Sequence, residues 1–289
     1  MNESEKPSDK PSPNSTLKEK LKFIEGIQNI PAMPVIVMDI LNKLNDPNIS
    51  VPELEKSISL DPALVSYILR IINSPFYGIR KEILTISKAL LLLGMKNVKN
   101  ILIGYGARKM FLSIENKKIQ QILWEHSVSV GVFAKLICED AFPDIQPQAY
   151  VAGLLHDIGK IVLLVHDPKR FRASINVTLM SDKSSVDAEY EQFGFSHIET
   201  GYFMLNKFKF SNILKDVVQF HHNPEFAPSD DYLIWIIGLA NELSYFLKEK
   251  VGDNINPYLE KLNLNINQLL TIIKEGEAEL ESQLATMKL

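Results

Sequence analysis

The 289-residue sequence has very little cysteine, no long hydrophobic run and no excess of positive charge. Its one cysteine, Cys138, cannot form a disulfide within the chain, and its apolar helical surroundings predict a buried, inert thiol. Runs such as YLIWIIGLA fall well short of the roughly 20 apolar residues that span a bilayer. Because the N-terminus is also acidic and polar, unlike a signal peptide, the sequence predicts a cytoplasmic protein without membrane association.

The formal net charge of −4 argues against a protein that mainly coats DNA or RNA, because such binding depends on clustered Lys and Arg. We therefore do not expect nucleic acid as a partner. Basic residues between Lys96 and Lys118 are interpreted as solvated helix faces. The first 17 residues are rich in proline, serine and charge, and they are predicted to form a disordered tail.

Most of the later sequence carries helical signals. Apolar residues recur at helical spacing, and no convincing period-2 strand pattern is present. Ser50 with Glu53 and Ser196 with Glu199 have the spacing of capping boxes at helix N-termini. Gly94 is predicted to separate two helices. The predicted fold class is therefore all-α.

One segment raises a chemical question. Residues 148–165, QAYVAGLLHDIGKIVLLV, are apolar on almost every side and predict a central helix, in which Gly153 and Gly159 let neighbouring helices approach closely. His156, Asp157 and Lys160 lie within this helix, although an unpaired charge in apolar surroundings is costly. Either these side chains satisfy one another as a structural polar group, or they form a metal or phosphate site.

The histidines point to a shared site. Imidazole and carboxylate together suit iron, manganese or zinc. His166 is assigned to the surface end of its helix. The other five histidines lie on segments able to converge on the His-Asp pair: His126, His156, His197, His221 and His222.

These residues carry a family resemblance. The segments WEHS, HDIGK, SHIETG and FHH occur in the order of the motifs of the HD superfamily of metal-dependent phosphohydrolases, which includes the HD-GYP phosphodiesterases. Upstream, DPAL, NSPFYG and ISKALLLLGMKNVKNIL are similar to the HDOD domain, a branch of the superfamily found in bacterial signalling proteins. The resemblance covers about residues 23–245.

The resemblance implies roles for individual residues. His126 matches the first histidine of the signature, His156 and Asp157 match the doublet, and Lys160 matches a lysine that lies near substrate phosphate in active relatives. The extra metal-binding histidines of the HD-GYP branch correspond to His197, His221 and His222.

The sequence also departs from the family pattern. Asn241 stands where the last aspartate of the signature is expected, and an amide is a neutral, weaker ligand that lowers the expected metal affinity. A register one turn away would bring Glu242 or Asp231 to that position instead. The glycine-tyrosine-proline motif is missing after the histidine pair, so hydrolysis of cyclic-di-GMP is not implied.

Two functions stay open. The resemblance favours a bacterial regulatory module that acts mainly through protein contact, with a partly retained metal site and a nucleotide as a candidate ligand. Because the HDOD region and its extensions occupy the whole length, its signalling partners are expected to act in trans. The alternative is a metal-dependent phosphohydrolase of a nucleotide or other phosphate ester, with Asp157 and Lys160 as catalytic residues.

A separate surface is predicted in the segment NSPFYGIRKEI. Residue types enriched in binding hot spots occur here, and we expect a partner or phosphate-ligand surface at Asn73, Phe76, Tyr77 and Arg80. The competing interpretation is a loop that docks the N-terminal helices onto the HD half.

The chain is predicted to have four parts. Residues 1–17 form the tail, 18–113 the N-terminal helical part of the HDOD domain, and 114–250 an HD-like helical bundle. Residues 251–289 form a C-terminal helical extension, which either packs on the body or pairs with a partner.

Overall fold

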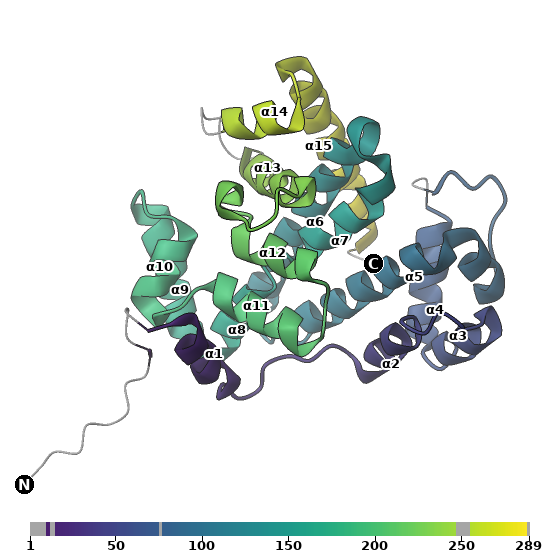
Figure 1. Cartoon of the computed structure of the whole chain (residues 1–289), viewed down its shortest axis with the longest axis horizontal. Helices are drawn as coiled ribbons and strands as arrows, with labels where there is room; N and C mark the ends of the chain where they lie inside the picture. The colour runs from purple at the N-terminus through teal and green to yellow at the C-terminus, as the bar shows by residue number, and fades with distance from the viewer. Residues whose placement is uncertain (1–9, 12–14, 75–76, 247–254, 288–289) are drawn as a thin grey trace, which may run out of the picture.

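The fold is built from helices throughout, which confirms the all-α class. The computed structural model describes residues 10–11, 15–74, 77–246 and 255–287, and these contain no β-strand. Most of the predicted tail, residues 1–9 and 12–14, lies outside the described residues. In Figure 1, α2 to α4 and the start of α5 lie at one end of the molecule, and α9 and α10 lie at the other.

The N-terminal helices begin where the capping signals predict. They are α1 (Leu17–Glu25), α2 (Val35–Lys43), α3 (Val51–Ile58) and α4 (Pro62–Ile72). The side chains of Ser50 and Glu53 bond reciprocally to each other's backbone N–H groups, which confirms the first capping box. Asp61 accepts from the backbone N–H groups of Ala63 and Leu64 and so starts α4.

Helix α5 (Ile86–Leu112) links the two halves of the molecule. Gly94 interrupts it with a left-handed backbone conformation (φ 68°), which confirms the predicted separation of two helical segments. Helix α5 packs on α2, α3 and α4 and also on α7 (Gln146–Leu155). Its second segment contacts both sides, since Tyr105 donates to Asp61 at the start of α4 and Gly104 lies close to Leu154 of α7. One long helix therefore joins the N-terminal helices to the HD half.

Helix α6 (Lys117–Ala141) is the central element of the HD half. Helices α7, α13 (Tyr232–Phe246) and α15 (Ile266–Met287) pack around it. At the crossing of α6 and α7, a Cβ added to Gly153 would lie 2.6 Å from the Gly131 Cα. The predicted close approach at Gly153 is therefore confirmed, and it brings the helix of His126 next to the helix that leads to His156.

The prediction of one continuous helix over residues 148–165 was wrong. Helix α7 ends at Leu155 and α8 (Gly159–His166) begins four residues later, so His156, Asp157 and Ile158 occupy a turn. The apolar pattern concealed this break because both helices are buried on nearly every side. The turn lets the His-Asp pair point into a shared interior space.

The remaining helices surround this turn. They are α9 (Pro168–Met180), α10 (Ser185–Phe193), α11 (His197–Lys207) and α12 (Asn212–Phe220), with short 3₁₀ turns at η2 (Pro143–Ile145) and η3 (Pro224–Phe226). Helix α1 packs on α11, where buried Lys20 donates to Glu199 at 3.1 Å. The phenol of Tyr190 on α10 also donates to Glu199. A segment from the start of the chain thus braces the helix that carries His197.

The C-terminal extension packs on the body. Gly276 on α15 lies against the Phe133 ring, and Lys135 on α6 pairs with Glu279 at 2.8 Å. Helix α14 (Asn256–Leu262) packs on α13.

Two further expectations concern burial. Cys138 is fully buried, and burial raises the pKa of its thiol to about 12, as expected for an inert cysteine. Among the described helices, the stretch Pro143–His166 is long and apolar enough to cross a bilayer, but 78% of its most apolar window is buried inside the protein. Such burial is typical of a core helix.

Candidate metal centre

The predicted histidines converge on Asp157. One group contains His126, His156 and Asp157, and the other contains Asp157, His197, His221 and His222. Within each group the ligand atoms lie within 4.8 Å of one another. Asp157 belongs to both groups, so the described residues form two adjoining candidate sites with a shared carboxylate.

Local folding explains why these residues meet. The second capping box is confirmed, since Ser196 and Glu199 bond reciprocally at the start of α11, and this places His197 in the first helical turn. A Cβ at Gly159 would lie 2.0 Å from the His197 carbonyl oxygen, so α8 and α11 touch at their N-termini as predicted. His221 and His222 follow directly after α12.

The distances around Asp157 are short. Its Oδ2 lies 3.3 Å from His126 Nε2 and 3.4 Å from His156 Nε2. Its Oδ1 lies 3.3 Å from His197 Nε2 and 3.9 Å from His221 Nε2. The two oxygens therefore face the two groups of histidines.

Backbone and carboxylate acceptors hold the outer nitrogens of three imidazoles. Nδ1 of His156 is 2.7 Å from the Gly153 carbonyl oxygen, and Nδ1 of His221 is 3.1 Å from those of Val217 and Val218. Nδ1 of His197 is 2.6 Å from Glu189 Oε2. With the proton placed on Nδ1, the Nε2 lone pairs point at Asp157, and this is the arrangement that second-shell partners give to metal ligands.

The electrostatics favour neutral imidazoles. Burial lowers the pKa of His126 to about 4, although Asp157 opposes this shift. Burial, together with neighbouring imidazoles, also holds the pKa values of His221 and His222 well below the usual range. A histidine binds metal in its unprotonated form, so these shifts favour ligation at neutral pH.

Charge in this region is incompletely balanced. Burial alone would raise the pKa of Asp157, but the ammonium of Lys160, 2.5 Å away, and the nearby histidines lower it well below the usual range. Burial opposes the charge on Lys160, and the Asp157 carboxylate raises its pKa overall. The buried carboxylates Asp157 and Glu189 lie near one ammonium group, that of Lys160, so a bound cation would offset negative charge here.

Orphaned atoms fit a metal at this position. Oδ1 of Asp157 and Nε2 of His221 are buried without a hydrogen-bond partner. The Nε2 atoms of His126 and His156 are 3.2 Å apart, as are those of His197 and His222. Two imidazole lone pairs at this distance repel each other unless a proton or a cation lies between them. The donor set of nitrogen and carboxylate oxygen suits iron, manganese or zinc.

The position of the last ligand stays a prediction. Asn241 is buried on α13, three residues before Ser244, whose hydroxyl lies 3.2 Å from His126 Nδ1. Neither Glu242 nor Asp231 belongs to the two ligand groups among the described residues. Asp231 instead accepts from the backbone N–H of Leu233, at the start of α13.

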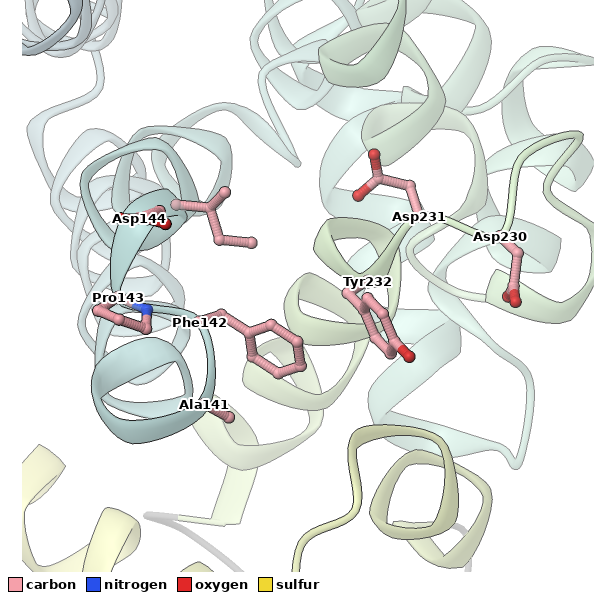
Figure 2. Close-up of a pocket in the computed structure, with 8 residues that line it drawn as sticks. Ala141, Phe142, Pro143, Asp144, Asp230, Asp231 and Tyr232 are labelled. Carbon is pink, nitrogen blue, oxygen red and sulfur yellow. The ribbon is translucent and has the colours of Figure 1, made fainter.

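Asp231 lines a different pocket. This open pocket has a volume of about 480 Å³ and lies between η2 and the start of α13. Figure 2 shows the rings of Phe142 and Tyr232 side by side at the pocket, and their centroids are 4.9 Å apart. None of the predicted metal ligands lines this pocket.

Sequence reasoning missed Glu189, Ser244 and Tyr245. Glu189 holds His197 from behind, Ser244 contacts the outer nitrogen of His126, and the Tyr245 ring lies 5.1 Å from the His126 ring. No spacing rule connects these residues to their partners. A carboxylate eight residues before a histidine was the only local signal for Glu189, and it is weak.

His166 also differs from its prediction. The residue lies at the end of α8 as expected, but it is half-buried, and its ring contacts Phe23, Phe193 and Phe195. It takes no part in either ligand group of the described residues.

Access to the centre is narrow. His156 and His197 have no exposed surface, and Asp157 is 3% exposed. His126 and His222 are partly exposed at the edges, and Tyr245 beside His126 is half exposed. The geometry suits the enclosure of small ions better than the docking of a large ester.

The surface predicted around residues 73–80 is partly structural. The Asn73 side chain exchanges two hydrogen bonds with the backbone of Ile83, at 2.7 and 2.8 Å, and so clamps the intervening loop. Tyr77 is half-buried against the core, and burial raises its pKa to about 12. Its role in a partner or ligand surface stays a prediction. Arg80 is exposed, and Phe76 lies outside the described residues.

Comparison with known proteins identifies the family. The family model described as the HDOD domain matches residues 30–224. The chain belongs to the HDOD domain family. A crystal structure of an HDOD domain protein with unknown function from Geobacter sulfurreducens is similar, with a TM-score of 0.72, 25% identity, and coverage of 94% of this chain and 96% of that one.

Other solved HDOD-like folds are more distant. A protein of Shewanella amazonensis with a provisional assignment as a phosphohydrolase has a TM-score of 0.70 at 19% identity, covering 92% of this chain and 95% of that one. A second protein of that organism, provisionally assigned as a metal-dependent phosphohydrolase, has a TM-score of 0.63 at 17% identity, covering 90% and 96%. These identities show the fold alone.

An uncharacterised protein of Treponema pallidum is a curated relative. It is 26% identical over 258 residues, a match that covers 84% of this chain. The same match covers 46% of that protein, so the chain spans about half the length of this relative.

Proposed function

We propose that this HDOD protein is a regulatory module that acts mainly through protein contact. We also propose that its centre binds one or two divalent metal ions. The observation that carries the proposal is the pair of buried ligand groups that share Asp157. Iron, manganese and zinc suit these ligands. Metal occupancy would then stabilise one arrangement of α6, α7, α11 and α12, the helices that supply or lead to the ligands.

Each ligand has a defined role in this proposal. His126 and His156 would hold one ion, His197, His221 and His222 would hold the other, and Asp157 would offer one oxygen to each. Glu189 would fix the orientation of His197. Asn241 remains a weak candidate ligand, and Lys160 would offset the charge of Asp157 in the absence of metal.

A metal-dependent phosphohydrolase is the second candidate. A divalent cation polarises phosphoryl oxygens and lowers the pKa of water, and Lys160 beside Asp157 would balance charge on a phosphate ester. The burial of Asp157 and His197 favours the regulatory role, because an ester can approach only the partly exposed edges at His126 and His222.

The test measures metal and activity on the same samples. Untagged wild type, Asp157→Asn and, as a matched control, His166→Gln would be analysed by elemental mass spectrometry. We expect metal in the wild type and in the control, and its loss in Asp157→Asn. Absence of metal from a folded wild type, even after incubation with iron, manganese or zinc, would overturn the proposed centre.

An esterase assay then separates the two roles. Wild type loaded with manganese would be incubated with bis-p-nitrophenyl phosphate and with nucleotide monoesters. We expect no turnover above that of Asp157→Asn. Turnover that is lost in Asp157→Asn but kept in His166→Gln would promote the phosphohydrolase.

A further inference from the structure

The first segment of α5 presents an apolar outer face to solvent. Ile86, Ala89, Leu90 and Leu93 are buried on its inner face. On the other side, Leu91 is 68% and Leu92 is 54% exposed. Leu84 just before the helix and Met95 just after the break at Gly94 are also exposed. We call Leu84, Leu91, Leu92 and Met95 the α5 edge.

Unpaired cations surround the α5 edge. Residues 80–99 contain five basic residues and one acidic residue, Glu82, which gives this stretch a formal charge of +4. Arg80, Lys81 and Lys88 are exposed, and none of them forms an ion pair among the described residues.

Two further lysines of this stretch form hydrogen bonds to neutral acceptor atoms. Lys96 donates to the Asp144 carbonyl oxygen at 3.0 Å, and Lys99 donates to the Asn45 amide oxygen at 3.3 Å. Neither forms a side-chain ion pair among the described residues. The stretch therefore carries an excess of basic side chains at the surface.

Charge separates this edge from the rest of the molecule. The whole chain carries −4, so the residues outside 80–99 carry −8 (−4 minus +4). Single exposed apolar residues are normal on protein surfaces, but four large ones within 12 residues, with cations beside them, mark an interaction site.

We propose that the α5 edge binds an acidic amphipathic helix of a partner protein. The leucines and Met95 would cover the apolar face of that helix, and Arg80, Lys81 and Lys88 would meet its carboxylates. This inference rests on the protein-contact part of the proposed function and gives the partner a chemistry.

Two other occupants fit less well. A second copy of this chain would bring two positive edges together, and like charges across an interface repel. An anionic bilayer would attract the edge but repel the remaining −8 of the molecule, whereas a short peptide feels only the field within about 10 Å.

The experiment uses two synthetic peptides and the full chain. Each peptide is a cross-linked helix with leucines at i, i+3, i+4 and i+7, because short uncross-linked helices are marginal in water. One carries glutamates at the remaining positions and the other carries lysines. Fluorescence anisotropy would measure binding. We expect the acidic peptide to bind at least tenfold more tightly than the basic one, and the affinity to fall as salt rises.

Surface variants locate the binding site. We expect two double variants to bind the acidic peptide at least tenfold more weakly than wild type. One is Leu91→Ser with Leu92→Ser, and the other is Lys81→Glu with Lys88→Glu. The matched control is Leu179→Ser with Met180→Ser, an even more exposed apolar pair at the end of α9, and it should bind like wild type. Equal loss in this control, or no loss in the α5 variants, would overturn the inference.

The alternative occupants have their own outcomes. Binding to vesicles of about 30% phosphatidylserine, without peptide binding, would assign the edge to a membrane surface and overturn the inference. A concentration-dependent dimer that the Leu91→Ser, Leu92→Ser variant abolishes would assign it to a second copy and do the same.

Failure here is distinguishable from failure of the metal centre. The metal content of the α5 variants should equal that of wild type. If the acidic peptide does not bind while metal is retained, the partner chemistry is wrong and the centre stands.

Discussion

The two ends of α5 lead to two differently built halves. In the HD half, polar side chains are buried at the centre, and helices from distant parts of the sequence hold them in place. In the N-terminal half, α2 to α4 enclose an apolar interior, and the notable feature is instead the uncovered α5 edge. The comparison teaches that the polar cluster of this chain is enclosed between several helices, whereas the apolar α5 edge lies on the outside of a single one.

Close packing in the HD half should be the easiest property to break. In Gly159→Ala the new methyl group would meet the His197 carbonyl oxygen at 2.0 Å. We expect a loss of about 3 kcal/mol in the free energy of unfolding, measured by urea denaturation. Gly26→Ala is the control, because its methyl group has 3.3 Å to the nearest backbone oxygen. If Gly159→Ala lost less free energy of unfolding than Gly26→Ala, the close contact between Gly159 and His197 would be contradicted.

Removal of metal should lower the stability of the fold through the ligand groups around Asp157. If metal is present at 100 times its Kd, chelation should lower the free energy of unfolding by about 2.7 kcal/mol. The thermal midpoint of wild type should fall on addition of EDTA, while that of Asp157→Asn should not move. An equal response of both proteins would show that the ions stabilise the fold elsewhere.

The Glu189 carboxylate behind His197 should influence metal affinity without being essential for it. In Glu189→Gln a neutral amide oxygen replaces the carboxylate oxygen that accepts from the backbone N–H and Nδ1 of His197, so the charge that raises the basicity of this imidazole is lost. We expect a metal affinity about 10 to 100 times weaker, measured by competition with a chelating dye. His166→Gln should keep the wild-type affinity. A Glu189→Gln variant with unchanged affinity would exclude this carboxylate from the centre.

The brace between α1 and α11 predicts a pH dependence. Burial opposes ionisation of Glu199, but hydrogen bonds from Tyr190 and Ser196 lower its pKa overall. This carboxylate therefore stabilises the fold above its unfolded pKa, and its contribution is lost as pH falls through the lower folded value. The free energy of unfolding of wild type, measured by urea denaturation, should exceed that of Glu199→Gln by about 1 kcal/mol at pH 7. The difference should shrink below pH 4.5, and a constant difference would refute the assignment.

The smallest effect is expected at the α5 edge. Leu92→Ser exposes no new surface in the interior, so the free energy of unfolding should change by less than about 0.5 kcal/mol. Leu90→Ala, on the buried face of the same helix, should cost about 2 to 5 kcal/mol. Similar losses from both would mean that the outer face is covered.

Local signals explain how much could be predicted. The capping boxes at Ser50 and Ser196, and the break at Gly94, depend on residues within one turn of the helix, so spacing alone located them. The set of histidines followed from motif order, and the structure brings that set together.

What could not be predicted is non-local. The turn between α7 and α8 was hidden by uniform burial. Glu189 and Ser244 matter because folding places them behind His197 and His126, and no spacing along the chain encodes that contact.

The helices outside the matched family region have a practical consequence. A fragment cut to residues 30–224 would lose α1, α13, α14 and α15. Glu199 would then lack Lys20, His126 would lack Ser244, and the side of α6 that α13 and α15 cover would face water. We therefore expect a fragment trimmed to the matched region to lose the candidate metal centre through unfolding and not through altered chemistry, because part of its support lies outside that region.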